Sequence, residues 1–450
     1  MTTPSASLRW ARGYVRVARG DSLVRNSLYL MLTTVETAGL GYVFWIVAAR
    51  MFSTAQVGIA SAVISLCSTV ALLTYLGPAA MLVERLHTYQ RPRAWKSFFA
   101  RMCVATAAVT ALLATVTVPL IAHAKGYGSY FSAAGAAVLA VTGAAVWTVV
   151  QMCCNAFIAA RRADGMFVVQ GLVSVFKVVL LVPLCTAGLG APGIVVAWVA
   201  SSVIGAAAGA FWLLPRIGPD AAQPEEAGPV PSSMAHERRA RHARSSRRRS
   251  DYVSHLVGQH LTSVGGQMTP LLLPILVVAR LGAGSNAYFY ITWMIGSVFF
   301  MVSPSISQAL FAESVRYDSG LRPTVVKAFR IASFLLIPAI VAMVVGGRLI
   351  LAIFGQAYVG AGYGLLVLLA ISAVPDAVSN VAVAICRATS RLGYSAAINL
   401  GTLFVAVAGA WVLMPRFGLL GVGISWLTAQ VLAALACIPV FLNVDGRAAA

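Results

Sequence analysis

Three ionisable side chains lie deep inside long apolar segments of this 450-residue chain, which contains only 13 acidic residues. Glu36, Lys177 and Asp376 each carry a charge that costs roughly 2.5–3.5 kcal/mol at the centre of a membrane helix. Such residues are expected to face a polar cavity or a partner. A lysine there could attract a diphosphate, and a carboxyl group could bind and release a proton or a sodium ion. Two structural alternatives stay open: a permanent Glu36–Lys177 ion pair, and an Asp376 side chain that caps backbone freed by Pro375.

Neutral polar residues extend these three positions along single helix faces. The stripes are Thr33, Glu36 and Thr37; Gln170, Ser174 and Lys177; Asp376, Ser379 and Asn380; and, more weakly, Gln151 with Asn155, and His260 with Ser263 and Gln267. Spacings of three, four and seven residues place side chains on the same face of a helix. Several converging stripes predict a hydrophilic cavity within the membrane.

Ten of the stripe residues have an expected role in this cavity. The predicted substrate-binding residues are Lys177, Gln170, Ser174, Gln151, Asn155, His260, Gln267 and Asn380. Glu36 and Asp376 are the predicted ion-coupling residues. For the amides and hydroxyls, hydrogen bonding between packed helices is an equal alternative.

The sequence lacks the patterns of a catalytic or metal-binding protein. Its six histidines show no ligand spacing, and the neighbours Cys153 and Cys154 point to different sides of a helix. No Asp-x-Asp pair occurs, although a membrane glycosyltransferase would need carboxylates or a large loop to hold a sugar donor. The G-x-G-x-x-G pattern at 188–193 joins two hydrophobic helices and follows no strand, so it is a helix turn. We therefore expect no enzyme activity, no cofactor and no metal.

The apolar segments themselves predict an integral membrane protein of about twelve helices. The chain is 59% hydrophobic and only 10% charged, whereas soluble domains are roughly 25% charged. Segments near 20 residues match the roughly 30 Å hydrocarbon core of a bilayer. The predicted spans are 27–49, 56–77, 102–123, 131–159, 166–187, 191–214, 256–279, 287–312, 331–354, 361–385, 394–414 and 418–442.

Basic residues are distributed unequally between the two sides of these spans. Most of the 33 Lys and Arg residues lie in the N-terminal tail, in alternate loops and after the last span. This is the positive-inside pattern, so we expect a multi-pass protein of the cell (inner) membrane with both termini in the cytoplasm. The net charge of +20 is then a topology signal and a contact with anionic lipid headgroups, and no nucleic-acid partner is expected.

Weak internal similarity divides the chain into two halves of six spans. Residues 47–51 resemble residues 277–281, and Gly190, Gly193 and Trp198 recur as Gly418, Gly421 and Trp426. Two halves that insert the same way up predict a pseudo-two-fold axis along the membrane normal, which is a transporter arrangement. The expected domains are a basic cytoplasmic tail (1–26), an N-terminal six-helix bundle (27–214), a flexible basic cytoplasmic linker (215–255), a C-terminal six-helix bundle (256–442) and a short cytoplasmic tail (443–450).

The first two spans carry a recognisable pattern. Residues 41–58, GYVFWIVAARMFSTAQVG, with ASAVIS at 60–65 and LTYLG at 73–77, resemble the start of polysaccharide-biosynthesis membrane proteins. These are oligosaccharide-lipid flippases of the multidrug/oligosaccharidyl-lipid/polysaccharide (MOP) exporter superfamily. The resemblance implies an all-α, MATE-like fold, with two six-helix bundles arranged as a V around a central cavity.

The same resemblance implies a function. An undecaprenyl-diphosphate-linked oligosaccharide would move from the inner to the outer leaflet by alternating access, for surface polysaccharide biosynthesis. Glycosyltransferases or a polymerase of the same pathway would be further partners. A cation-coupled multidrug (MATE-like) antiporter is the main alternative. A lipid II flippase is a lesser one, because those relatives have fourteen spans and an arginine-rich cavity.

Overall fold

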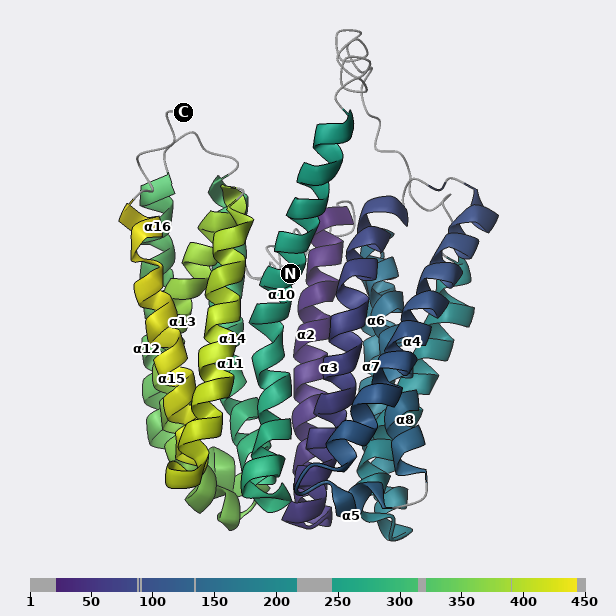
Figure 1. Cartoon of the computed structure of the whole chain (residues 1–450), viewed down its shortest axis with the longest axis vertical. Helices are drawn as coiled ribbons and strands as arrows, with labels where there is room; N and C mark the ends of the chain where they lie inside the picture. The colour runs from purple at the N-terminus through teal and green to yellow at the C-terminus, as the bar shows by residue number, and fades with distance from the viewer. Residues whose placement is uncertain are drawn as a thin grey trace, which may run out of the picture. The chain divides into compact units, whose positions relative to one another are not determined.

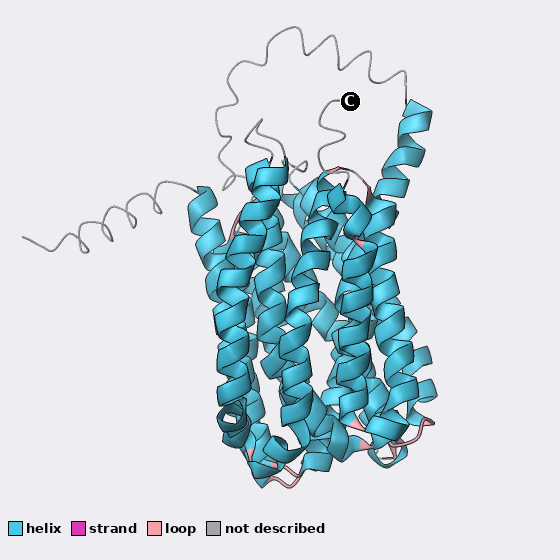
Figure 2. Cartoon of the chain, turned by 90° about the vertical axis from the view of Figure 1, so that its left-hand side faces the viewer, coloured by secondary structure: helices cyan, strands magenta, loops and turns pink. Residues whose placement is uncertain are grey.

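The computed structural model describes residues 22–86, 89, 91–132, 135–216, 245–314, 321–389 and 391–442. These residues form helices joined by short turns, and no strand occurs among them (Figure 2). The long helices are α2 (Ser22–Met51), α3 (Thr54–Arg85), α4 (Pro92–Ala122), α6 (Ala136–Ala159), α7 (Ala163–Thr186), α8 (Gly190–Ala207), α10 (Ser245–Leu281), α11 (Ala283–Ser314), α12 (Leu321–Phe354), α13 (Gln356–Ala388), α14 (Leu392–Phe417) and α15 (Leu419–Ala436) (Figure 1). The short elements are α5 (Gly128–Phe131), the π-helical η2 (Ala208–Leu213), the 3-10 helix η3 (Leu214–Arg216) and α16 (Ile438–Leu442).

Every predicted span overlaps a helix or a run of consecutive helices, which confirms the predicted all-α membrane fold. Eleven helices in the described part of the chain are long and apolar enough to cross a membrane. The eighth predicted span, 287–312, lies within α11, which falls outside that set. Because hydrocarbon offers no hydrogen bonds, the helix is the conformation that pairs the backbone of each apolar segment internally. The chain is a multi-pass membrane protein.

Several helices begin before the apolar segments that predicted them. Helix α4 begins at Pro92, α10 at Ser245 and α12 at Leu321, about ten residues early in each case. These extensions contain Arg and Lys, which form helices readily, so the helix continues beyond its apolar part. Helix α10 thus includes the end of the predicted linker. The rest of that linker, 217–244, and the tails 1–21 and 443–450 lie outside the described residues.

The helices group into two compact units. Of the described residues, unit 1 contains those within Met1–Ala48, Val70–Pro119 and Gly135–Pro229. Unit 2 contains those within Ala49–Thr69, Leu120–Ala134 and Val230–Ala450. Helices α2, α3 and α4 therefore contribute residues to both units.

Within unit 1, a chain of hydroxyl groups joins three helices. Thr74 of α3 lies 2.7 Å from Thr110 of α4, and Thr110 lies 3.0 Å from Thr148 of α6, between the Oγ1 atoms in each case. Helix α8 packs against both α6 and α7. Buried polar groups are nearly always hydrogen-bonded in folded proteins. Here the three threonine hydroxyls serve as partners for one another between otherwise apolar helices.

Within unit 2, small residues bring α10 and α14 into close contact. A Cβ atom added at Gly265 would lie 2.8 Å from the backbone carbon of Asn399, so only glycine fits there. Two hydrogen bonds cross the same contact, one between Thr262 Oγ1 and Ser395 Oγ at 2.9 Å and one from Asn399 Nδ2 to the Thr262 carbonyl at 2.8 Å. Small residues at helix interfaces are typical of membrane proteins, since van der Waals contact is a main attraction between helices in lipid.

The N-terminal part of α3 also packs within unit 2, against α11. A Cβ atom at Gly58 would lie 1.6 Å from the carbonyl oxygen of Ala283, so the two backbones approach as closely as glycine allows. The fully buried Asn286 side chain donates from Nδ2 to the Gly58 carbonyl at 2.7 Å and to Ser61 Oγ at 3.1 Å. The Asn286 amide of α11 therefore forms hydrogen bonds with two polar groups of α3.

Candidate functional site

In unit 1, the Glu36 carboxyl group lies directly against α7. A Cβ atom added at Gly171 would lie 2.4 Å from Glu36 Oε1. Glu36 Oε2 is buried and has no hydrogen-bond partner among the described residues. The hydroxyl groups of Thr33 and Thr37 bond to carbonyl groups of their own helix, at 2.7 Å each. The glycine therefore makes the space that the carboxyl group occupies.

Lys177 lies further along the same contact between α2 and α7. Its Nζ atom is 5.6 Å from the centre of the buried Phe44 ring, a cation–π geometry. No carboxylate oxygen of a described residue lies within 4.0 Å of this ammonium group. Glu36 and Lys177, both described, thus do not form the ion pair considered as a structural alternative. Each carries its charge without an oppositely charged contact in the described structure.

The predicted amides of unit 1 bond mainly to one another. Gln151 Nε2 donates to the Tyr75 hydroxyl at 3.3 Å, and Gln170 Nε2 donates to Gln151 Oε1 at 3.4 Å and to Cys154 Sγ at 3.5 Å. Asn155 Nδ2 donates to the Gln151 carbonyl at 2.8 Å. Ser174 is buried on α7. The amides thereby join α3, α6 and α7, which is what the helix-packing alternative expects.

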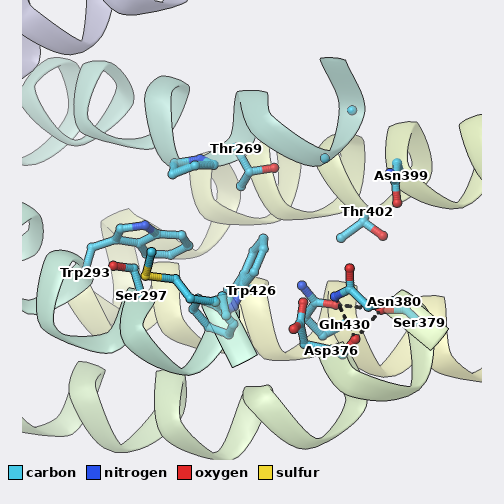
Figure 3. A pocket seen from close by; sticks show the side chains of 15 residues that line it. Thr269, Trp293, Ser297, Asp376, Ser379, Asn380, Asn399, Thr402, Trp426 and Gln430 are labelled. Carbon is cyan, nitrogen blue, oxygen red and sulfur yellow. Dashed lines mark hydrogen bonds between the residues drawn. The ribbon is translucent and has the colours of Figure 1, made fainter. Parts of the chain in front are cut away.

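Unit 2 contains a cavity of about 290 Å³ between α10, α11, α13, α14 and α15 (Figure 3). Its polar and aromatic side chains belong to residues that are far apart in the sequence. They are Thr269, Trp293, Ser297, Asp376, Ser379, Asn380, Asn399, Thr402, Trp426 and Gln430 (Figure 3). Phe300, Met301, Gly265, Gly266 and Pro270 complete the wall.

The polar end of this cavity is built around Asp376. Ser379 Oγ lies 3.0 Å from the Asp376 carbonyl and 3.5 Å from Gln430 Oε1, and Asn380 Nδ2 donates to the same carbonyl at 3.0 Å. Asp376 is 7% exposed, and its Oδ2 atom has no hydrogen-bond partner in the described part of the chain. Helix α13 continues through Pro375. The carboxyl group is thus surrounded by hydrogen-bonding groups and keeps an unused acceptor.

The other end of the cavity is aromatic. The rings of Trp293 and Trp426 meet edge to face, with centres 5.1 Å apart and an angle of 70° between their planes. Phe300 lies 5.4 Å from Trp426 in a similar arrangement. The indole Nε1 of Trp426 is buried, and no described residue accepts its hydrogen. The wall therefore combines apolar ring surface with an unused donor.

The structure brings some of the predicted residues together and leaves others apart. Asp376 and Asn380 line the unit 2 cavity, whereas His260 and Gln267 do not. Gln267 is exposed, and its Nε2 atom contacts the Ser263 carbonyl of its own helix at 3.4 Å.

The sequence reasoning missed several residues of the cavity wall. They are Trp293, Asn399, Thr402, Trp426 and Gln430. Asn399 and Gln430 are amides in the middle of apolar spans, a weaker version of the signal that identified Asp376. The two tryptophans gave no such signal, because an indole ring in an apolar segment is ordinary core.

The comparison with protein families supports the resemblance in the first spans. Residues 23–218 match the family described as "Polysaccharide biosynthesis protein". This match confirms the resemblance that residues 41–77 indicated. None of the curated proteins matches the chain.

Solved structures share the fold over almost the whole chain. A multidrug resistance MATE family transporter of the MOP superfamily, in its inward-facing conformation, is 16% identical with a TM-score of 0.60, and 94% of each chain is covered. The lipid II flippase MurJ, in an inward closed conformation, is 10% identical with a TM-score of 0.63, covering 94% of this chain and 90% of that one. A MOP superfamily transporter from Pyrococcus furiosus is 15% identical with a TM-score of 0.58, and 95% of each chain is covered.

The chain therefore has the fold of the MOP superfamily transporters. Its residues 23–218 match the family described as "Polysaccharide biosynthesis protein". Together, the family match and the fold support a flippase or exporter.

Proposed function

We propose that this protein is a flippase that moves an undecaprenyl-diphosphate-linked oligosaccharide from the inner to the outer leaflet of the cell membrane by alternating access. The lipid tail can stay in the bilayer while the sugars and the diphosphate cross it. Unpaired polar groups in hydrocarbon cost several kcal/mol each, and a polar path through the protein removes most of that barrier. No covalent bond is made or broken, so no catalytic residue is needed.

Lys177 is the observation that carries this proposal. Its ammonium group lies inside a span with no carboxylate of a described residue within 4.0 Å, and its Nζ atom lies over the Phe44 ring at 5.6 Å from the ring centre. A compact point charge in a region of low dielectric attracts a diphosphate strongly. A lysine kept only for packing would be expected to have a permanent anionic partner.

Glu36 and Asp376 are our candidates for ion coupling, one in each unit. Asp376 is buried and Glu36 is half-buried, and each carboxyl group has one buried oxygen with no hydrogen-bond partner among the described residues. Transporters commonly use intramembrane acids to bind and release ions, and a carboxyl group without a fixed partner is free to do so. We further propose that both termini are cytoplasmic, because most Lys and Arg residues lie on that side.

The central test is transport of a fluorescent undecaprenyl-diphosphate-linked disaccharide in proteoliposomes. Lys177→Arg should retain part of the wild-type rate. Lys177→Met should lose most of it, with an unchanged amount of folded protein. Lys125→Met is the matched control, because Lys125 is exposed in the turn between α4 and α5 and should tolerate the change. A wild-type rate in Lys177→Met would contradict the role of Lys177, and no transport by the wild type would contradict the proposed function.

A further inference from the structure

The cavity of unit 2 differs in its electrostatics from the surroundings of Lys177. Asp376 is the one ionisable side chain among the residues that line it, and none of them is a Lys or an Arg. A diphosphate would meet a carboxyl group there and no compensating positive charge. The cavity is therefore suited to a neutral or cationic ligand.

Neutral hydrogen-bonding side chains outnumber every other polar group in this wall. Asn380, Asn399 and Gln430 present amides, and Ser297 and Thr402 present hydroxyls. A small cation needs a few oxygen ligands and has no use for donors. A ligand covered with hydroxyl groups needs both donors and acceptors, which amides supply in fixed positions.

Two buried groups of the wall are left unpaired and have opposite character. Asp376 Oδ2 is an acceptor and Trp426 Nε1 is a donor, and neither has a hydrogen-bond partner among the described residues. Buried polar groups in proteins are normally satisfied, so each such exception requires an explanation. A sugar hydroxyl can donate to a carboxylate and accept from an indole N–H, so one class of ligand satisfies both groups.

The aromatic end of the cavity adds an apolar platform. Trp293, Trp426 and Phe300 pack together beside the polar side chains (Figure 3). The faces of aromatic rings are electron-rich and attract the polarised C–H groups on the flat side of a pyranose. The volume of about 290 Å³ is at the lower end of small-ligand pockets, which span roughly 300–1,000 Å³. It suits one or two sugar rings, not a complete lipid-linked repeat unit.

We infer that the cavity of unit 2 is a binding site for an uncharged sugar ring of the transported glycolipid, with Asp376, Asn380, Asn399 and Gln430 bonding its hydroxyls and Trp426 Nε1 donating to one of them. This inference rests on the proposed function. It assigns the sugar ring to the cavity of unit 2.

The test compares two probes on the purified full chain in detergent, by native mass spectrometry. One probe is undecaprenyl diphosphate carrying a single N-acetylglucosamine, and the other is undecaprenyl diphosphate alone. The wild type should bind the sugar-bearing carrier about tenfold more tightly. Trp426→Phe removes the unpaired donor without breaking a described hydrogen bond, so it should reduce this preference to less than about threefold while binding of the bare carrier is unchanged. Trp212→Phe, at an exposed position outside the cavity, is the matched control and should keep the full preference.

The outcomes separate this inference from the proposed function. Equal binding of both probes by the wild type, or an unchanged preference in Trp426→Phe, would overturn the sugar site alone. Binding of neither probe would overturn the proposed function as well. Tetraphenylphosphonium serves as a third probe. Tight binding that Asp376→Asn abolishes, in a protein without sugar preference, would make the cavity an organic-cation site and would also overturn the inference.

Discussion

Replacing Gly171 by alanine should displace the Glu36 carboxyl group while leaving the fold almost unchanged. The added Cβ atom would lie 2.4 Å from Glu36 Oε1, whereas ordinary van der Waals contact begins at 3.4 Å. The oxygen must therefore move by about 1 Å. The carboxyl group is the far end of a flexible side chain, so it will move before the helices do.

The two energetic effects of this substitution nearly cancel. Alanine stabilises a helix interior by roughly 0.5–1 kcal/mol relative to glycine. A side chain forced away from its preferred rotamer costs roughly 0.5–1.5 kcal/mol. The net change in the free energy of unfolding should stay within about 1 kcal/mol, which for a chain of 450 residues is a shift in melting temperature of about 1 °C.

The effect on transport should be much larger than the effect on stability. Functional groups need to be held within about 0.5 Å of their working position, and the expected displacement is twice that. We expect ion-gradient-driven transport in proteoliposomes to fall on the order of tenfold. Gly39→Ala is the matched control, since it lies on the same helix as Glu36 with no atom within 4 Å of an added Cβ.

The double variant Gly171→Ala/Glu36→Gln sharpens this test. If the alanine acts through the carboxyl group, the double variant should be no worse than Glu36→Gln alone, because the two changes remove the same interaction. Full gradient-driven transport in Gly171→Ala would refute the idea that Glu36 must occupy this position. An equal loss in Gly39→Ala would assign the effect to helix stiffness instead.

Three further predictions follow from the same structure. Glu36→Gln and Asp376→Asn should fold and bind substrate but lose the dependence of transport on an ion gradient; lower protein abundance, recovered in Glu36→Gln/Lys177→Met, would favour a structural role. Cysteines introduced by Ser232→Cys, outside the described residues, and by Ser285→Cys should react with an impermeant thiol reagent from opposite sides of the membrane, and labelling of the first from outside intact cells would contradict the topology. Asn286→Ala should lower the free energy of unfolding by about 1–3 kcal/mol, because two hydrogen bonds to α3, to the Gly58 carbonyl and to Ser61 Oγ, are lost at roughly 0.5–1.5 kcal/mol each; a melting temperature equal to that of the wild type would show that these bonds do not stabilise the protein.

The sequence predicted the structure best where placing a group in the hydrocarbon core of the membrane costs free energy. Apolar segments located all the spans, since only helices pair their backbones in lipid. Glu36, Lys177 and Asp376 were conspicuous because charges inside spans are rare, and the structure places each of them at an interior contact or cavity. The helix ends were less predictable, because α4, α10 and α12 continue as helices beyond their apolar parts.

Helix α10 shows why the remaining residues of the site were not predictable. Its polar stripe, His260 and Gln267, was assigned to the interior, yet the face that reaches the cavity carries Gly265, Gly266 and Thr269. A polar side chain needs a hydrogen-bond partner, but it can find one in its own helix. Gln267, for example, donates to the backbone carbonyl of Ser263, four residues earlier. A small residue, in contrast, indicates that the backbone of another helix comes close, and no contact within the same helix can take that place.

Glycine positions are therefore the better guide to the packed face of a membrane helix. Gly171 on α7 meets Glu36, and Gly265 on α10 meets Asn399 of the cavity wall. In both places the glycine face, combined with a polar residue inside a neighbouring span, defines the site. Neither signal alone identifies which helices meet, since that pairing depends on contacts between residues far apart in the sequence, such as Trp293 with Trp426.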